Sequence, residues 1–74
     1  LGDKPGAIDD YNLAIKINPN YAKAYHRRGI VRDDLGDKPG AIRDLQQAVK
    51  LYQQQGGNEK WLRAAQDRIR ELQQ

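Results

Sequence analysis

The sequence contains no cysteine, which excludes disulfide bonds and thiolate metal sites. It also contains no serine or threonine, so the hydroxyl and thiol groups that serve as catalytic nucleophiles are all missing. His26 is the single histidine, and no second ligand lies near it at helical spacing. We therefore predict that the protein is not an enzyme and that it uses no cofactor, no metal and no small-molecule substrate.

Long apolar runs are missing too. No stretch approaches the length of a membrane span or of a signal peptide, so no membrane contact is expected. A chain of 74 residues with 38% hydrophobic content can bury only one small core. The net charge of +3 permits an acidic partner but falls short of a polybasic tail for nucleic acid. We expect a cytoplasmic location by default. Targeting signals of a longer parent protein would not be visible in this sequence.

One stretch of the sequence occurs twice. Leu1–Ile8 returns unchanged as Leu35–Ile42, at an offset of 34 residues. The likeness extends beyond the identical block, through the pairs Asp10/Asp44, Ala14/Ala48, Ile15/Val49, Lys16/Lys50 and Ile17/Leu51. Self-similarity at such a period is typical of stacked helical repeats.

Apolar residues at helical spacing predict four helices, at about residues 4–17, 21–35, 38–54 and 58–72. Asp3 is predicted to cap the first helix, with Pro5 in its first turn. Asn20 is expected to cap the second helix, and Gly36 suits the left-handed turn that closes it.

The second helix is predicted to turn different residues inward and outward. Arg28 faces inward by its methylene stem, and Gly29 lets a neighbouring backbone come close. The outward face holds Lys23, His26, Arg27, Ile30 and Asp34.

The fourth helix departs from the repeat and has a single apolar seam with a charged back. The seam contains Trp61, Leu62, Ala65, Ile69 and Leu72. Such a helix is expected to act as a terminal cap, which stacked repeats need in order to cover their last face.

These features resemble the tetratricopeptide repeat family over roughly residues 1–55. Tyr25 stands at the tryptophan-like position and Gly29 at the glycine, while Arg28, Arg32 and Gln53 replace the leucine, the tyrosine and the closing proline. The resemblance implies an all-α fold of antiparallel helix-turn-helix repeats, a fragment of a right-handed α-solenoid with a C-terminal capping helix.

The resemblance also implies a division of the chain. Residues 1–20 are helix B of an incomplete N-terminal repeat, residues 21–55 are a complete repeat with helices A and B, and residues 56–74 are the capping helix. Because the chain starts within a repeat and without methionine, we expect it to be a piece of a longer protein. The face of Ala7, Ile8 and Tyr11 is expected to be covered by a second copy of the chain, giving a homo-oligomer, or by upstream repeats.

Several charges on the second helix oppose the local electrostatics. Lys23 lies near the positive end of the helix dipole, and Asp33 and Asp34 lie near the negative end. Charges often depart from these helix-end preferences at sites where the departure serves another role, such as binding. One interpretation is that Lys23, His26 and Arg27 form a basic strip for an acidic partner. The other, weighed slightly ahead, is that they pair with carboxylates on neighbouring repeats.

Helix A of the family lines a groove in which peptides dock. The resemblance therefore implies a partner-binding set made of Lys23, His26, Arg27, Ile30, Asp33 and Asp34. Our leading hypothesis is a noncatalytic interaction scaffold for a protein or peptide. Two alternatives stay open, a structural or self-associating spacer and, less favoured, nucleic-acid binding. The basic residues for the second alternative would be Arg27, Arg28, Arg32, Arg43 and Lys50.

Overall fold

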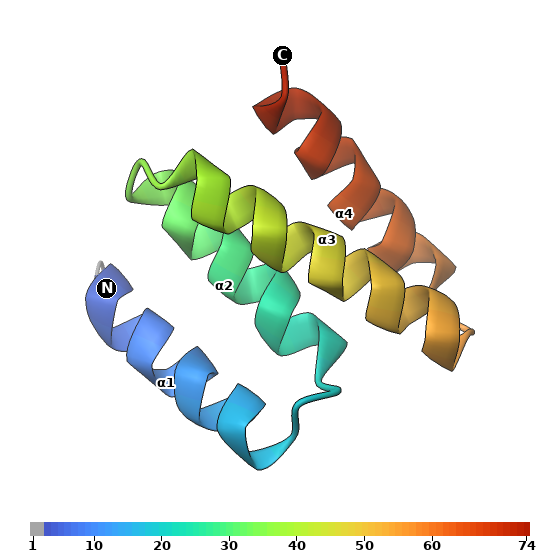
Figure 1. Ribbon diagram of the computed structural model, residues 1–74, viewed down its shortest axis with the longest axis horizontal. Coiled ribbons are helices and arrows are strands. Elements are labelled where there is room, and N and C mark those ends of the chain that lie inside the picture. The colour runs from blue at the N-terminus through green and yellow to red at the C-terminus, as the bar shows by residue number, and fades with distance from the viewer. Residues whose placement is uncertain (1–2) are drawn as a thin grey trace.

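The computed structural model describes residues 3–74, which form four helices joined by short turns and contain no strand. The helices are α1 (Lys4–Ile17), α2 (Ala22–Asp34), α3 (Lys38–Gln55) and α4 (Glu59–Leu72). Each helix runs antiparallel to the one before it, and α1 and α4 lie at opposite sides of the central pair α2 and α3 (Figure 1). The observed all-α stack of helix-turn-helix units confirms the predicted fold class.

The two copies of the repeated stretch begin their helices in the same way. The Asp37 side chain accepts a hydrogen bond from the Gly40 amide at 3.0 Å, and the Asp3 side chain accepts one from the Gly6 amide at 3.0 Å. A proline follows in each first turn, where an amide hydrogen would have no partner inside the helix. These caps explain why both helices start where the sequence predicts.

The turn after α2 closes the helix through a left-handed glycine. Gly36 has φ 89°, its amide donates to the Asp33 carbonyl at 2.9 Å, and the Asp37 amide donates to the Arg32 carbonyl at 2.8 Å. This pair of bonds is the Schellman arrangement, which satisfies carbonyls at the end of a helix.

The predicted cap of α2 is wrong. Tyr21 occupies the N-cap position, and no side chain caps this helix. The Asn20 amide instead donates to the Asn18 side chain at 3.1 Å, which shapes the turn around Pro19. Asparagine and aspartate often bind the backbone two residues on in this way.

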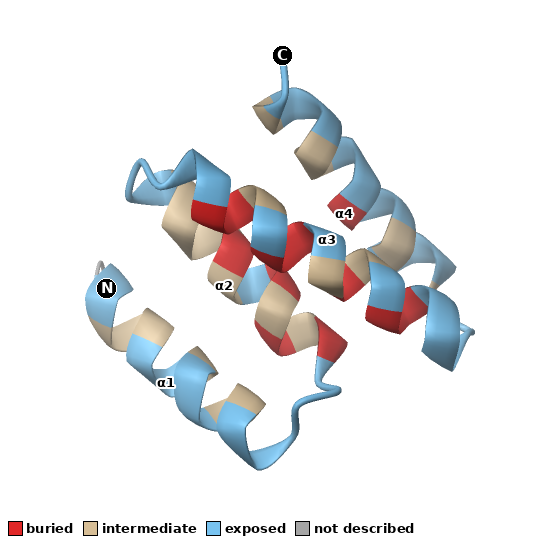
Figure 2. Cartoon of the chain, viewed as in Figure 1, coloured by how far each residue is buried: buried red, intermediate tan, exposed pale blue. Residues whose placement is uncertain are grey.

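The core lies between α2, α3 and α4 (Figure 2). Leu45 and Ala48 on α3 are completely buried, and Ala65 is the one buried residue of α4. Gly29 lies where α2 crosses α3, because a Cβ atom there would be 3.0 Å from the Leu45 side chain and 3.1 Å from the Ala41 carbonyl oxygen. The close approach predicted for Gly29 is therefore confirmed.

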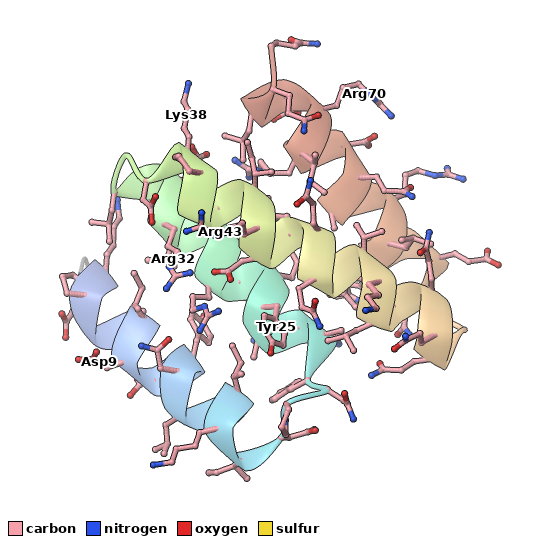
Figure 3. All side chains as sticks on the ribbon, in the orientation of Figure 1. Asp9, Tyr25, Arg32, Lys38, Arg43 and Arg70 are labelled. Carbon is pink, nitrogen blue, oxygen red and sulfur yellow. The ribbon has the colours of Figure 1, made fainter. Side chains whose placement is uncertain are left out.

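Helix α4 covers α3 with part of its predicted seam. Leu62, Ile69 and Leu72 pack against the core, and the back of the helix is exposed, where Arg70 points away from α3 (Figure 3). Trp61, however, is 43% exposed and lies outside the core cluster. Its assignment to the buried seam is wrong, and its contacts lie with α2 instead.

No helix formed by residues 3–74 is long and apolar enough to cross a membrane.

Candidate interaction surface on helix α2

A hollow of about 130 Å³ lies where the N-terminal half of α2 meets the end of α3 and the start of α4. Four of the six predicted site residues contribute to its lining, together with two aromatic residues. The lining residues are Lys23, His26, Arg27, Ile30, Tyr52 and Trp61. We call this feature the α2 hollow.

His26 does not point outward, so that prediction is wrong. The side chain belongs to a buried residue, 6% exposed, whose Nδ1 is hydrogen-bonded to the Tyr52 hydroxyl at 3.0 Å. The Trp61 ring lies nearly perpendicular to the imidazole, with an interplanar angle of 86° and ring centroids 6.2 Å apart. The imidazole therefore forms a wall of the hollow and is held in place by two aromatic neighbours.

The charge state of His26 follows from this position. Burial lowers the pKa of the imidazole below its ordinary value, and the positive charges of Arg68 and Arg27 lower it further. His26 is then neutral at pH 7, because even the unperturbed pKa lies below that pH. The basic strip predicted from the sequence contains two cations, Lys23 and Arg27, instead of three.

Lys23 and Arg27 occupy the rim of the hollow. The Lys23 ammonium lies 4.7 Å from the centroid of the Trp61 ring, a cation–π contact that the sequence did not predict. Arg27 is exposed. Within residues 3–74 no carboxylate lies at ion-pair distance from either cation, and the predicted pairing with carboxylates on neighbouring repeats stays a prediction.

The two aspartates of the predicted set lie away from the hollow. Asp33 accepts a hydrogen bond from Arg68 of α4 at 3.4 Å, so it links α2 to the capping helix. Asp34 is exposed and lines none of the hollow. The structure thus brings together the basic and apolar members of the set but separates both acids from them.

Arg28 and Arg32, two positive charges four residues apart on α2, both bind one buried carboxylate on α3. Asp44 is 4% exposed and accepts two hydrogen bonds from Arg28, at 2.7 and 2.9 Å, and one from Arg32 at 2.9 Å. Asp44 also raises the pKa of Arg28. Both arginines are therefore part of the α2–α3 contact, which removes two of the five residues considered for nucleic-acid binding.

Tyr52 and Trp61 line the hollow but were not among the predicted site residues, because helical spacing predicts Tyr52 to face the core, where it is 2% exposed, and Trp61 to lie in the seam of the fourth helix. Tyr52 lies in the last turn of α3, which continues beyond Leu51, the counterpart of the final residue of α1. Trp61 lies in the first turn of α4, where the 34-residue likeness has already ended. Composition offered one signal, because Trp61 is the single tryptophan of the chain.

Possible metal ligands were also compared among residues 3–74. In the described part of the chain, no group of three or more histidine, aspartate and glutamate side chains is close enough to hold an ion.

A family model described as TPR repeat matches residues 1–36, which span α1, the turn after it and all of α2. This match confirms the tetratricopeptide repeat resemblance for residues 1–36. The 34-residue recurrence extends the same pattern to α3. Comparison with curated proteins and with solved structures gave no significant match. Tetratricopeptide repeats generally mediate protein–protein interactions and are generally noncatalytic, so the family supports a role in protein binding.

Proposed function

We propose that this chain is a noncatalytic scaffold that binds a peptide segment of another protein in the α2 hollow. The observation that carries the proposal is the composition of the hollow, an apolar and aromatic interior beneath two rim cations. Ile30, Tyr52 and Trp61 offer apolar contact, and the buried core of a protein interface is typically apolar with aromatic residues enriched. Lys23 and Arg27 add a positive charge that favours an acidic segment.

The expected ligand therefore has two parts. One apolar side chain of the peptide enters the hollow, and an acidic side chain or a terminal carboxylate contacts the rim. Arg27 is the better partner for a carboxylate, because its guanidinium can donate two parallel hydrogen bonds. Lys23 already lies against Trp61, which holds the ammonium close to the mouth of the hollow.

The first test is selection of 12-residue peptides from a random display library against the 74-residue chain. We expect the enriched peptides to combine acidic with large apolar residues. Binding of these peptides should weaken at least about tenfold in the Lys23→Glu, Arg27→Glu double variant and in Trp61→Ala, as for anchor residues of other interfaces.

A matched control keeps the change in net charge constant. Lys38 and Arg43 are exposed on α3 and lie outside the hollow (Figure 3). The Lys38→Glu, Arg43→Glu variant should bind the selected peptides as the parent chain does. If both double variants lost affinity for the peptides equally, the change in net charge alone would explain the effect. If Trp61→Ala kept the affinity of the parent chain, the hollow would be ruled out as the binding site.

A further inference from the structure

The wall of the α2 hollow contains a hydrogen-bond donor that follows from the pairing of His26 with Tyr52. Burial raises the pKa of the Tyr52 hydroxyl, which therefore keeps its proton at pH 7. Within residues 3–74, His26 Nδ1 at 3.0 Å is the one hydrogen-bond partner of this hydroxyl. The hydroxyl donates to Nδ1, because otherwise its buried proton would have no acceptor. A neutral imidazole that accepts at one nitrogen carries its hydrogen on the other, so the hydrogen of His26 lies on Nε2.

The Nε2–H group of His26 opens into the hollow. Among the described residues, every fully buried polar side-chain atom has a hydrogen-bond partner. Nε2 has no partner among residues 3–74, so it is not fully buried, and the space that His26 lines is the α2 hollow. The imidazole therefore offers a ligand in the hollow one N–H donor.

The other polar side chains of the hollow do not supply an acceptor. Lys23 and Arg27 can donate hydrogen bonds but cannot accept them, and the Tyr52 hydroxyl is already engaged with Nδ1. A ligand that pairs with these groups must therefore bring acceptor atoms. The hollow is matched to an anionic group and unsuited to an amine.

Helices α2 and α4 place charges around His26, whereas α3 contributes the neutral tyrosine described above. Lys23 and Arg27 lie on α2, and Arg68 lies on α4, where it donates to Asp33 at 3.4 Å. Among these charges three are positive, and the one negative charge is bound to Arg68. Burial, followed by the charges of Arg68 and Arg27, lowers the pKa of the imidazole. An anion placed in the hollow would reverse this balance.

We propose that His26 contacts the ligand, makes the α2 hollow selective for an acidic group, and couples binding of that group to proton uptake. Nε2–H donates to an oxygen of the ligand's carboxylate, and the imidazole takes up a proton from the solvent once the anion is in place. This role rests on the proposed function and deepens it, because it identifies which group of the peptide is recognised and how pH regulates its binding.

Proton uptake follows from the charge of the ligand. A carboxylate within hydrogen-bond distance favours the imidazolium, so binding raises the pKa of His26. By linkage, a ligand that raises this pKa binds more tightly at a pH at which the imidazole is charged. When Nδ1 gains the second hydrogen, the Tyr52 hydroxyl turns and accepts from it, since a hydroxyl serves in either role. Affinity should therefore rise as the pH falls from 7.5 to 5.5.

The test uses display-selected peptides that contain no histidine, each made in a second form with its carboxylates replaced by amides. The chain carries a single histidine, so the Cε1 proton of His26 gives an unambiguous NMR signal. We expect an acidic peptide to raise the pKa read from this signal. By fluorescence anisotropy it should bind at least about threefold more tightly at pH 5.5 than at pH 7.5. The amide form should change by less than about 1.5-fold, and carboxylates of aspartate and glutamate stay charged in this range.

His26→Asn is the matched variant, because the asparagine oxygen can replace Nδ1 as the partner of Tyr52 while the titrating ring and its Nε2 donor are lost. It should remove the pH dependence and weaken binding of the acidic peptide at least about threefold at pH 5.5. Tyr52→Phe keeps the imidazole, so its affinity should still rise toward pH 5.5. Circular dichroism at both pH values establishes that each variant is folded. Comparison of the two peptide forms on the parent chain needs no variant.

Three results would overturn the role of His26 alone. These are equal pH dependence for the acidic and amide peptides, an unchanged pKa of His26 on binding, and a pH dependence that persists in folded His26→Asn. If Trp61→Ala still weakened binding about tenfold, the proposed function would stand in each case. Full affinity in Trp61→Ala, or the selection of no peptide, would instead remove the site and both proposals with it.

Discussion

Asp10 and Asp44 occupy the same position of the repeat but have different surroundings. Asp44 is buried and binds two arginines of α2, whereas Asp10 is exposed. A carboxylate that loses contact with water must be compensated by charged or hydrogen-bonding partners, and Asp44 has both. Identical residues therefore contribute differently to stability, depending on whether a neighbouring helix covers them.

This difference predicts the effect of one substitution at two positions. Asp44→Ala should lower the free energy of unfolding by about 2–3 kcal/mol, because it leaves two arginines without their carboxylate. The Arg28 and Arg32 side chains remain 15% and 26% exposed, which keeps the loss below that of a fully buried pair. Asp10→Ala should change it by less than about 0.5 kcal/mol. Urea unfolding followed by circular dichroism measures the free energy of unfolding of both variants. Equal losses of stability would contradict the larger contribution expected from Asp44.

His26 predicts how stability depends on pH. Its pKa is lowered in the folded chain, mainly by burial, from an ordinary value of 6.5. The unfolded chain therefore binds the proton first as the pH falls, which favours unfolding. The stability that the neutral, buried His26 contributes is complete above pH 6.5, and it is lost as the pH falls from there through the lowered pKa.

The corresponding measurement is the free energy of unfolding between pH 7.5 and 5.5, where aspartate and glutamate change little. The parent chain should become less stable toward pH 5.5. His26→Phe removes the titrating group and should flatten this dependence, whatever its effect on stability at pH 7.5. Parallel curves for the two proteins would show that another group titrates.

At the scale of elements, α1 and α3 begin with the same residues but are held to different extents. Helix α3 lies between α2 and α4 and contains most of the core. Helix α1 packs mainly against α2, and Arg28 donates a side-chain hydrogen bond to Asn12 at 2.8 Å across this contact. The same starting sequence is thus a central helix in one copy and an edge helix in the other.

This asymmetry predicts a gradient in hydrogen exchange. Amides in the middle of α1, from Tyr11 to Ile15, should exchange at least about a hundredfold faster than those from Leu45 to Val49 on α3, because few buried contacts oppose local opening of α1. Nitrogen-15 NMR after transfer to heavy water resolves the two sets. Equal protection would mean that all four helices unfold as one unit.

At the scale of the whole molecule, the fold was predictable because the signals that define it are local and occur twice. The Asp-Lys-Pro start and the Gly36 turn set helix bounds that agree with the structure to within about two residues. Gly29 was predictable as a point of close approach, since only a glycine leaves room for a crossing backbone.

The α2 hollow was only partly predictable, because it depends on where α4 lies. Periodicity placed Lys23 and Arg27 on the outward face of α2, but it could not show that α4 covers part of that face. Trp61 and Tyr52 enclose His26 from outside the region in which the repeat is regular. The position of a helix that departs from the repeat depends on tertiary packing, so its contacts could not be inferred from the period.

The two ends of the helix stack also give the molecule a direction. At one end, α1 keeps the residue pattern through which α3 packs against α2. At the other end, the outer face of α4 is charged, with Arg63 and Arg70 exposed. A further 34-residue unit placed before α1 would find a compatible surface without any change to the existing sequence. Extension beyond α4 would first require its polar back to be replaced. Gene duplication or protein engineering could therefore lengthen this stack from one side only.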